Sequence, residues 1–166
     1  MFENMNVCSV LGLAGLIVFG FLILKALVSP AHVQTGNRYF KSPIPKGMRI
    51  YETTRVVGTS FRLQDVLAWS AAKKQNLKLS GDPKNKHDKN AIMVIGACQT
   101  KKGEQHAHLG FVDKDIAARI AKMKVEGELD LVARLKAIWI SDDLKQASIE
   151  FDLLGPKEHY KEFMGR

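Results

Sequence analysis

The sequence GDPKNKHDKN at residues 81–90 leads directly into the apolar run AIMVI at residues 91–95. The first ten of these residues include three lysines, two Asn, two Asp, a His and a Pro, but no aliphatic side chain. A segment of this composition cannot build a hydrophobic core, whereas the run after it is typical of a strand. The pattern predicts a long polar loop held between strands, where binding groups are often found.

The residues on either side of this loop predict a mainly β domain. Short strands are expected at residues 49–58, 77–79, 91–95 and 106–112, and a closing hairpin at residues 129–153. In that hairpin, apolar and polar residues alternate on both sides of a Ser-Asp-Asp turn. Several short strands with one or two short helices predict a strongly curved sheet or a small OB-like β-barrel.

Two short helices are expected in this domain. The first lies within residues 61–74, where apolar residues have helical spacing. The second begins at Asp113, whose carboxylate can cap free backbone N–H groups. Between the last two strands before this helix, residues 96–105 are expected to form a turn region.

Near the N-terminus, residues 7–24 form a run of 18 residues without a charge. As a helix this run is about 27 Å long, which is close to the thickness of the hydrocarbon core of a bilayer. A cleaved signal peptide is the alternative, but residues 1–6 carry Glu3 and no Lys or Arg, whereas the start of a signal peptide is positive. We therefore expect residues 7–28 to be an uncleaved transmembrane helix.

The charges that follow this run predict its orientation. Five Lys or Arg residues and no acidic residue lie from Lys25 to Arg49. The positive-inside rule therefore puts residues 1–6 outside and the domain, at residues 48–155, in the cytoplasm. Residues 29–47 are expected to be a linker and residues 156–166 a C-terminal tail.

The net charge of the chain is +8, which favours a polyanionic partner such as a nucleic acid or an anionic membrane surface. The chain has two cysteines, Cys8 and Cys98, and the first lies in the expected membrane segment. They cannot form a disulfide framework, so a reducing compartment fits the domain.

The sequence contains no recognisable catalytic motif. His106 and His108 would lie on one face of a strand and are weak candidates for a metal site, but the chain has no CxxC and no HExxH motif. The carboxylates lack the spacing of a metal-dependent nuclease, and neither a nucleophile elbow nor a Walker A motif is present. We therefore expect no enzyme and no cofactor, with a metal-dependent nuclease as the least favoured interpretation.

Three pieces of the domain, taken together and in order, resemble the HIRAN domain family. They are Val56-Val57-Gly58 followed by Phe61, the pattern Asp-Pro-x-Asn-x-His-Asp-x-Asn-Ala-Ile-x-Val from Asp82, and Leu109-Gly110-Phe111-Val112. The resemblance covers residues 56–123. It implies an OB-like barrel that binds DNA, which in the best understood members grips the 3′ end of a single strand. Many members are joined to SNF2-type ATPases, and we expect no such motor within these 166 residues.

The resemblance also implies roles for individual residues. Phe61 matches an aromatic residue that stacks on a base, while Asn85, His87 and Asp88 match loop positions that contact the terminal nucleotide. The position of His87 is often tyrosine. Ser60 takes the place of a basic residue that helps to bind DNA in the helicase-like members, so one cation is missing here.

The chemistry of these residue types supports such roles. An exposed ring can stack on any base, which contributes about 1–3 kcal/mol in single-strand binding. The carboxylate of Asp88 can accept a hydrogen bond from a free 3′ hydroxyl, and Lys86 with two neighbouring lysines offsets its repulsion of the phosphates. Lys114 matches a lysine placed to meet phosphate, in a first helical turn whose free N–H groups favour an anion.

Several of these residues also have a purely structural explanation. Asn85, Asp88 and Asn90 are typical turn residues that bond their own backbone, and for Asn90 we prefer this interpretation. The sequence leaves Phe61 open between the core and the surface. Two main interpretations follow: a membrane-anchored module that binds single-stranded DNA or 3′ ends, and a scaffold that has lost DNA binding and holds an unidentified protein partner. DNA binding is the main interpretation, and the departures from the family pattern at Ser60 and His87 motivate the scaffold alternative.

Overall fold

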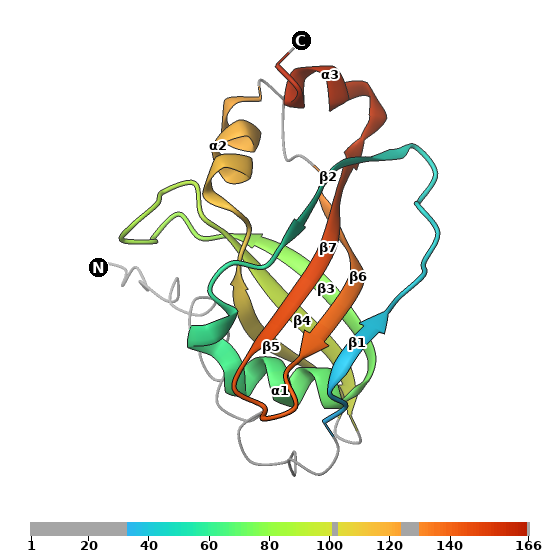
Figure 1. The fold of residues 1–166 in the computed structure, drawn as a ribbon. Coiled ribbons are helices and arrows are strands. Elements are labelled where there is room, and N and C mark those ends of the chain that lie inside the picture. Colours follow the sequence, from blue (N-terminus) through green and yellow to red (C-terminus); the bar gives the residue numbers. More distant parts are fainter. Residues whose placement is uncertain (1–32, 101–102, 124–129, 166) are drawn as a thin grey trace, which may run out of the picture.

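The computed structural model describes residues 33–100, 103–123 and 130–165, and the fold is given for these ranges. Their strands form two sheets, with short helices at the edges (Figure 1). The predicted transmembrane helix at residues 7–28, with residues 1–6 before it, lies outside the described residues. Within the described ranges, no helix is long and apolar enough to cross a membrane.

The strands of both sheets are antiparallel to their neighbours. The first sheet has the order β1-β6-β7-β2 and consists of β1 (Gly36–Tyr39), β6 (Val132–Ile140), β7 (Ala147–Pro156) and β2 (Met48–Arg55). The second has the order β3-β4-β5 and consists of β3 (Lys73–Gly81), β4 (Ile92–Thr100) and β5 (Gly103–Phe111). The predicted closing hairpin is confirmed as β6 and β7, and the long polar loop lies between β3 and β4.

Short helices follow the strands. They are the 3-10 helix η4 (Thr59–Arg62), α1 (Leu63–Ala71), α2 (Lys114–Lys122), the 3-10 helix η5 (Lys157–His159) and α3 (Tyr160–Phe163). The predicted start of α2 is confirmed, because Asp113 is its N-cap and accepts a hydrogen bond from the backbone N–H of Asp115 at 2.9 Å. The helix predicted within residues 61–74 is also present, as η4 and α1.

The core lies between the two sheets and is completed by α1. Trp69 of α1 is fully buried, and its indole N–H donates to the carbonyl oxygen of Ala97 in β4 at 3.0 Å. Phe151 of β7 and Leu109 of β5 are also fully buried and belong to the same cluster. This packing fixes α1, and with it the η4 turn just before it, against the second sheet.

The two sheets do not close into the predicted OB-like barrel. An isolated bridge joins them at one corner, where Val57 and Phe111 exchange backbone hydrogen bonds of 2.8 and 2.9 Å. On the opposite side no ladder joins β3 to the first sheet within the described residues. β1 has only four residues there, and the chain leaves it through Pro43 and Pro45, which lack the N–H that a ladder needs. The mainly β prediction is confirmed, but the closed barrel is wrong.

Two segments predicted to be irregular contain strands. The turn region expected at residues 96–105 is largely the paired ends of β4 and β5, because Ala97 and Cys98 are buried against the core. The linker expected at residues 29–47 contains β1, which pairs with β6 from Gly36 to Tyr39.

The C-terminal tail carries η5 and α3, and an aromatic cluster holds it on β2. The ring of Tyr51 stacks on that of Phe163 with the centroids 4.7 Å apart, and its hydroxyl donates to the carbonyl oxygen of Pro156 at 2.7 Å. The guanidinium of Arg49 lies 3.9 Å from the centre of the Tyr160 ring. The tail is therefore packed as part of the domain.

Candidate nucleic-acid interface

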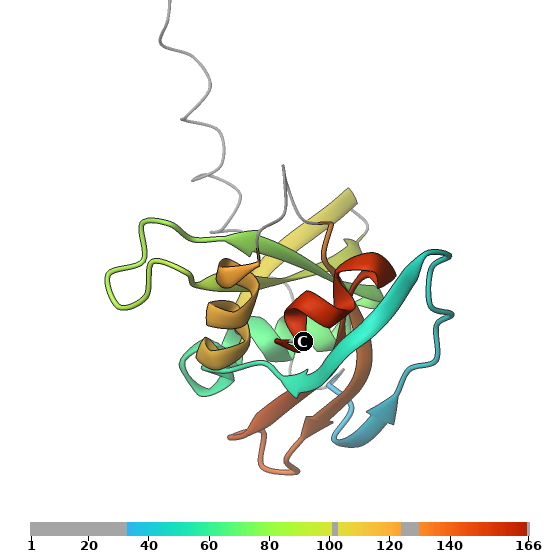
Figure 2. The same cartoon turned by 90° about the horizontal axis from the view of Figure 1, so that it is seen from above.

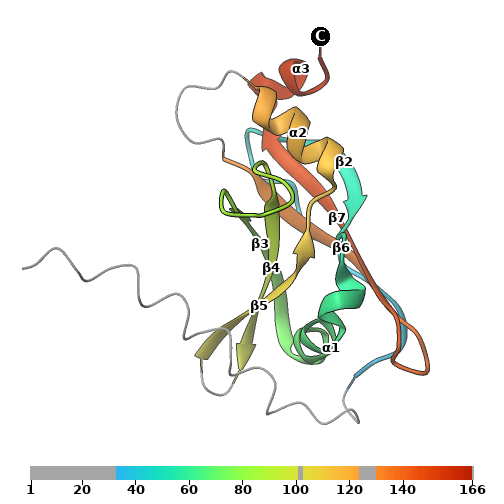
Figure 3. The ribbon, with the colours of Figure 1, turned by 90° about the vertical axis from the view of Figure 1, so that its left-hand side faces the viewer.

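Three segments that are distant in the sequence lie on one side of the molecule, which Figure 3 views directly. They are η4 with the turn before it, the polar loop, and the first turn of α2. We call this surface the loop face and define it as residues 57–62, 82–90 and 113–115. The Val57–Phe111 bridge and a hydrogen bond from the N–H of Val112 to the carbonyl oxygen of Ile92, at 2.9 Å, bring the segments together around the end of β5.

The bridge depends on Gly110. Its φ is +146°, a conformation that L side chains rarely adopt, and a Cβ there would lie 2.2 Å from the carbonyl oxygen of Val57. Only glycine allows the end of β2 to approach β5 so closely. Gly58, with φ at +84°, then turns the chain into η4, where the N–H of Phe61 donates to the carbonyl oxygen of Gly58 at 3.1 Å.

Phe61 projects into solvent. Its exposed fraction is 91%, and no residue of η4 is buried, so the ring has no packing role. Val57, at the start of the same turn, is 49% exposed and adds apolar surface to the loop face. Ser60 and Arg62, the residues before and after Phe61 in the sequence, are also exposed. Arg62 thus supplies a cation in the turn where Ser60 does not, and sequence analysis missed it.

The polar loop is held in shape by its own side chains. The side-chain oxygen of Asn85 accepts hydrogen bonds from the N–H groups of His87 and Asp88 at 3.0 and 3.2 Å. Its amide nitrogen donates to the carboxylate of Asp82 at 3.0 Å. Asp88 accepts from the N–H of Asn90 at 2.9 Å through Oδ1, while its Oδ2 has no hydrogen-bond partner among the described residues. The turn role of Asn85 and Asp88 is therefore present, and Asp88 still offers one acceptor.

Cations surround this loop. The side chains of Lys84, Lys86 and Lys89 are exposed, as is that of His87, and Lys114 is exposed in the first turn of α2. In the described part of the chain, none of the four lysines is paired with a carboxylate. Cations without a carboxylate partner are available to phosphate groups.

The two histidines considered as metal candidates have different surroundings. His106 is exposed and lies 2.7 Å from the carboxylate of Glu104, which also accepts a hydrogen bond from Lys78 at 2.6 Å. The bonds from Lys78 and His106 lower the pKa of Glu104 to about 2. His108 is buried. Over the ranges that the structure describes, no three His, Cys, Asp or Glu side chains gather where they could hold a metal ion.

His108 lies beneath the loop face. Its Nε2 is 3.0 Å from the carbonyl oxygen of Gly110. Burial lowers the pKa of His108, and the charge of Arg62 lowers it further, while the hydrogen bond to Gly110 and the charges of Asp82 and Asp65 raise it less. Charges from η4, from α1 and from the start of the loop therefore act on the same buried ring.

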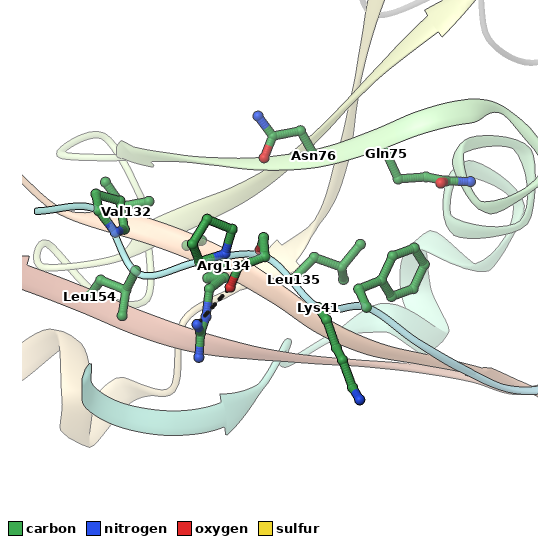
Figure 4. A pocket seen from close by; sticks show the side chains of 12 residues that line it. Lys41, Gln75, Asn76, Val132, Arg134, Leu135 and Leu154 are labelled. Carbon is green, nitrogen blue, oxygen red and sulfur yellow. Dashed lines mark hydrogen bonds between the residues drawn. The ribbon is translucent and has the colours of Figure 1, made fainter. Parts of the chain in front are cut away.

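A separate hollow occupies the gap between β3 and β6 (Figure 4). Its volume is about 340 Å³, and it is lined by residues 40–43, Pro45, Gln75, Asn76, residues 132–135 and Leu154. The guanidinium of Arg134 donates to the carboxylate of Asp152 at 2.5 Å and to the carbonyl oxygen of Ser42 at 2.9 Å. Burial raises the pKa of Asp152, but hydrogen bonds from Thr53 and Arg134 outweigh this and lower it overall. Because this charge is already paired, the loop face is the better candidate for an anionic ligand.

Comparison with known protein families finds one match. The sequence matches the family model of the HIRAN domain over residues 51–156, which is more than half of the chain. Among solved structures, the crystal structure of the HIRAN domain of human HLTF is similar, with 20% sequence identity and a TM-score of 0.38, covering 72% of this chain and 89% of that chain. No curated protein matches the chain.

Proposed function

The chain belongs to the HIRAN domain family, and on this basis we propose that its domain binds single-stranded DNA or 3′ DNA ends at the loop face. A HIRAN domain by itself is a binding module, and DNA is the general ligand of the family. The observation that carries the proposal is the solvent-exposed ring of Phe61 on the same side of the molecule as a built polar loop, whose lysines have no carboxylate partner among the described residues. Aromatic rings next to cations are the usual means of holding single strands.

Each chemical group of the loop face has a task in this proposal. Phe61 stacks on a base, and Arg62, Lys114 and the loop lysines meet the phosphates. Oδ2 of Asp88 accepts a hydrogen bond from a free 3′ hydroxyl, whereas a 3′ phosphate would place negative charge against the carboxylate. Asn85 holds the backbone of Asp88 in the orientation that makes this contact. A preference for free 3′ ends follows.

Fluorescence anisotropy with labelled oligonucleotides and the detergent-solubilised full chain tests the proposal. We expect binding at low salt, weaker binding to an oligonucleotide with a 3′ phosphate, and a loss of about 5- to 150-fold with Phe61→Ala, the equivalent of about 1–3 kcal/mol. Tyr39→Ala is the matched control, because this ring is 75% exposed but lies on β1, away from the loop face.

Absence of binding at low salt, or equal losses with the two variants, would contradict DNA binding at the loop face. Equal affinity for free and phosphorylated 3′ ends would remove the role of Asp88 alone. A protein partner that remains bound to the chain after nuclease treatment, without any nucleic acid, would favour the scaffold function instead.

We also propose that residues 7–28 anchor this module in a membrane, with the domain on the cytoplasmic side. The support is the uncharged 18-residue run and the excess of Lys and Arg after it. Alkaline extraction of membranes and protease accessibility of the domain before and after permeabilisation test the two parts. Release of the full chain by alkali contradicts the anchor, and digestion of the domain without permeabilisation contradicts the orientation.

A further inference from the structure

Two further aromatic rings are exposed on the outer side of the first sheet. Tyr39 of β1 is 75% exposed and Trp139 of β6 is 36% exposed. Asn37 is the ladder partner of Trp139, and Tyr39 lies two residues beyond Asn37 on the same strand. Residues that are opposite in a ladder share a face, as do residues two apart, so the two rings are diagonal neighbours. With Ser148, the partner of Trp139 in β7, these residues define the outer sheet face.

The rings of the outer sheet face have no role in the core. Ile138 and Ile140, on either side of Trp139, are buried on the opposite side of the sheet. Within the described residues, neither the hydroxyl of Tyr39 nor the indole N–H of Trp139 has a hydrogen-bond partner. Tyrosine and tryptophan combine an apolar ring with one polar group, and both are enriched where membrane and water meet.

The chain connects this face to the expected membrane anchor. From residue 28 to Tyr39 the chain spans at most about 40 Å when fully extended. Lys41 and Lys46 lie two and seven residues after Tyr39. Both are exposed, and neither is paired with a carboxylate in the part of the chain that the structure describes. Cations held this close to a bilayer are attracted to anionic headgroups.

We propose that the outer sheet face docks on the surface of an anionic membrane, with Tyr39 and Trp139 at the level of the headgroups. The inference rests on the proposed membrane anchor, which brings the face to the bilayer. Figures 1 and 2 show β1 and the polar loop on opposite sides of the molecule. Docking through the outer sheet face, whose β1 edge lies opposite the polar loop, therefore leaves the loop face uncovered, where a DNA strand can reach it.

The tryptophan content of the chain makes a direct test possible. Its two tryptophans are Trp69 and Trp139, and the first is fully buried. The full chain is reconstituted into vesicles that contain phosphatidylserine, with and without a lipid that carries a quencher just below the headgroups. We expect the quencher to remove most of the emission of Trp139 and to leave that of Trp69. The Trp139→Phe variant, which keeps an aromatic ring at this surface position, should then show little quenching.

Control measurements on the same vesicles separate the possible failures. Unquenched emission from a chain that resists alkaline extraction overturns docking and leaves the anchor standing. Release by alkali overturns the anchor and docking together. Quenching that disappears when single-stranded DNA is added identifies DNA as the occupant of the outer sheet face. Quenching that disappears when the protein is diluted in the bilayer identifies a second copy of the chain. Either result also overturns docking. Quenching that persists in a chain with no DNA affinity supports docking and refutes the proposed DNA binding alone.

Discussion

The loop face and the outer sheet face both expose aromatic rings, but they are built on different supports. Phe61 stands on a one-turn helix, on the same side of the molecule as a loop whose backbone N–H groups donate hydrogen bonds to its own side chains. Tyr39 and Trp139 stand on a regular ladder. The first support gathers a ring, a carboxylate and several cations from three segments, which suits one particular ligand terminus. The second presents rings in a plane, which suits an extended surface.

The largest expected effect comes from breaking the bridge that creates the loop face. Gly110→Ala would force a Cβ to within 2.2 Å of the Val57 carbonyl oxygen at a φ of +146°, so we expect a loss of about 3 kcal/mol in the free energy of unfolding, with weaker DNA binding. Chemical denaturation measures the first effect. Gly81→Ala is the control, because nothing lies within 4 Å of the added Cβ, and it should change stability by less than about 0.5 kcal/mol. Equal stability of the two variants would show that the Val57–Phe111 bridge leaves room for a side chain at position 110.

A second comparison removes three cations from the loop face or three from elsewhere on the surface. Replacing Lys84, Lys86 and Lys89 by Gln should reduce the slope of log affinity for single-stranded DNA against log salt by up to about 2, because three phosphate contacts are lost. The matched variant replaces Lys41, Lys46 and Lys145, which are exposed outside the loop face, and should keep the slope. Anisotropy titrations over a range of salt concentrations give both values. Identical slopes for the two triple variants would refute the electrostatic part of the proposal.

A smaller effect is expected from loosening the loop without touching its cations. Asn85→Ala removes the bonds to the N–H groups of His87 and Asp88 and to Asp82. We expect faster hydrogen exchange at those two amides and about fivefold weaker DNA binding, the equivalent of about 1 kcal/mol. Asn37→Ala removes the same side chain from the outer sheet face and should change neither quantity. Unchanged hydrogen exchange at these amides in Asn85→Ala would mean that the loop keeps its conformation without the Asn85 side chain.

The smallest effect concerns pH. The pKa of His108 in the folded chain is lowered from 6.5, so the unfolded chain takes up the proton first as the pH falls. The contribution of the buried neutral His108 to the free energy of unfolding is fully present above about pH 6.5 and is lost progressively as the pH falls below it. Thermal unfolding at pH 7.5 and 5.5 should therefore show a smaller drop in Tm for His108→Gln than for the unchanged chain. Glu104, with a pKa of about 2, does not titrate in this range. An equal drop in both proteins would contradict this assignment.

The parts of the loop face that could be predicted from sequence have local causes. The Asn and Asp spacing predicts the loop because those side chains bond amides two or three residues away, and Asp113 predicts the start of α2 for the same reason. The exposure of Phe61 could not be predicted, because an aromatic residue after a glycine turn fits a core as well as a surface. Arg62 was missed for a related reason, because a charged residue type does not show that its side chain is exposed in the same turn as the Phe61 ring.

The parts of the fold that could not be predicted depend on contacts between distant residues. Whether sheets close into a barrel is decided by which strand edges meet, and here β3 and the short β1 do not pair. β1 itself lies in a segment rich in Gly and Pro without a period, so only its partner β6 makes it a strand. The small and polar residues 96–105 are typical of a turn, yet β4 and β5 extend into this segment, where Gly96 lies against the Trp69 ring and the Ala97 carbonyl oxygen accepts the indole hydrogen bond.

The shortness of β1 has a mechanical consequence. The chain enters the domain through these four residues, which pair with β6. Just after them, the N–H of Phe40 donates to the Lys136 carbonyl oxygen at 2.9 Å. The guanidinium of Arg38, within β1, donates to the Ser70 carbonyl oxygen at 2.9 Å. Any force transmitted from the N-terminal side is loaded on this edge strand first. Under tension β1 would separate before the longer ladders of β6, β7 and β2, and the loop face on the opposite side would keep its structure.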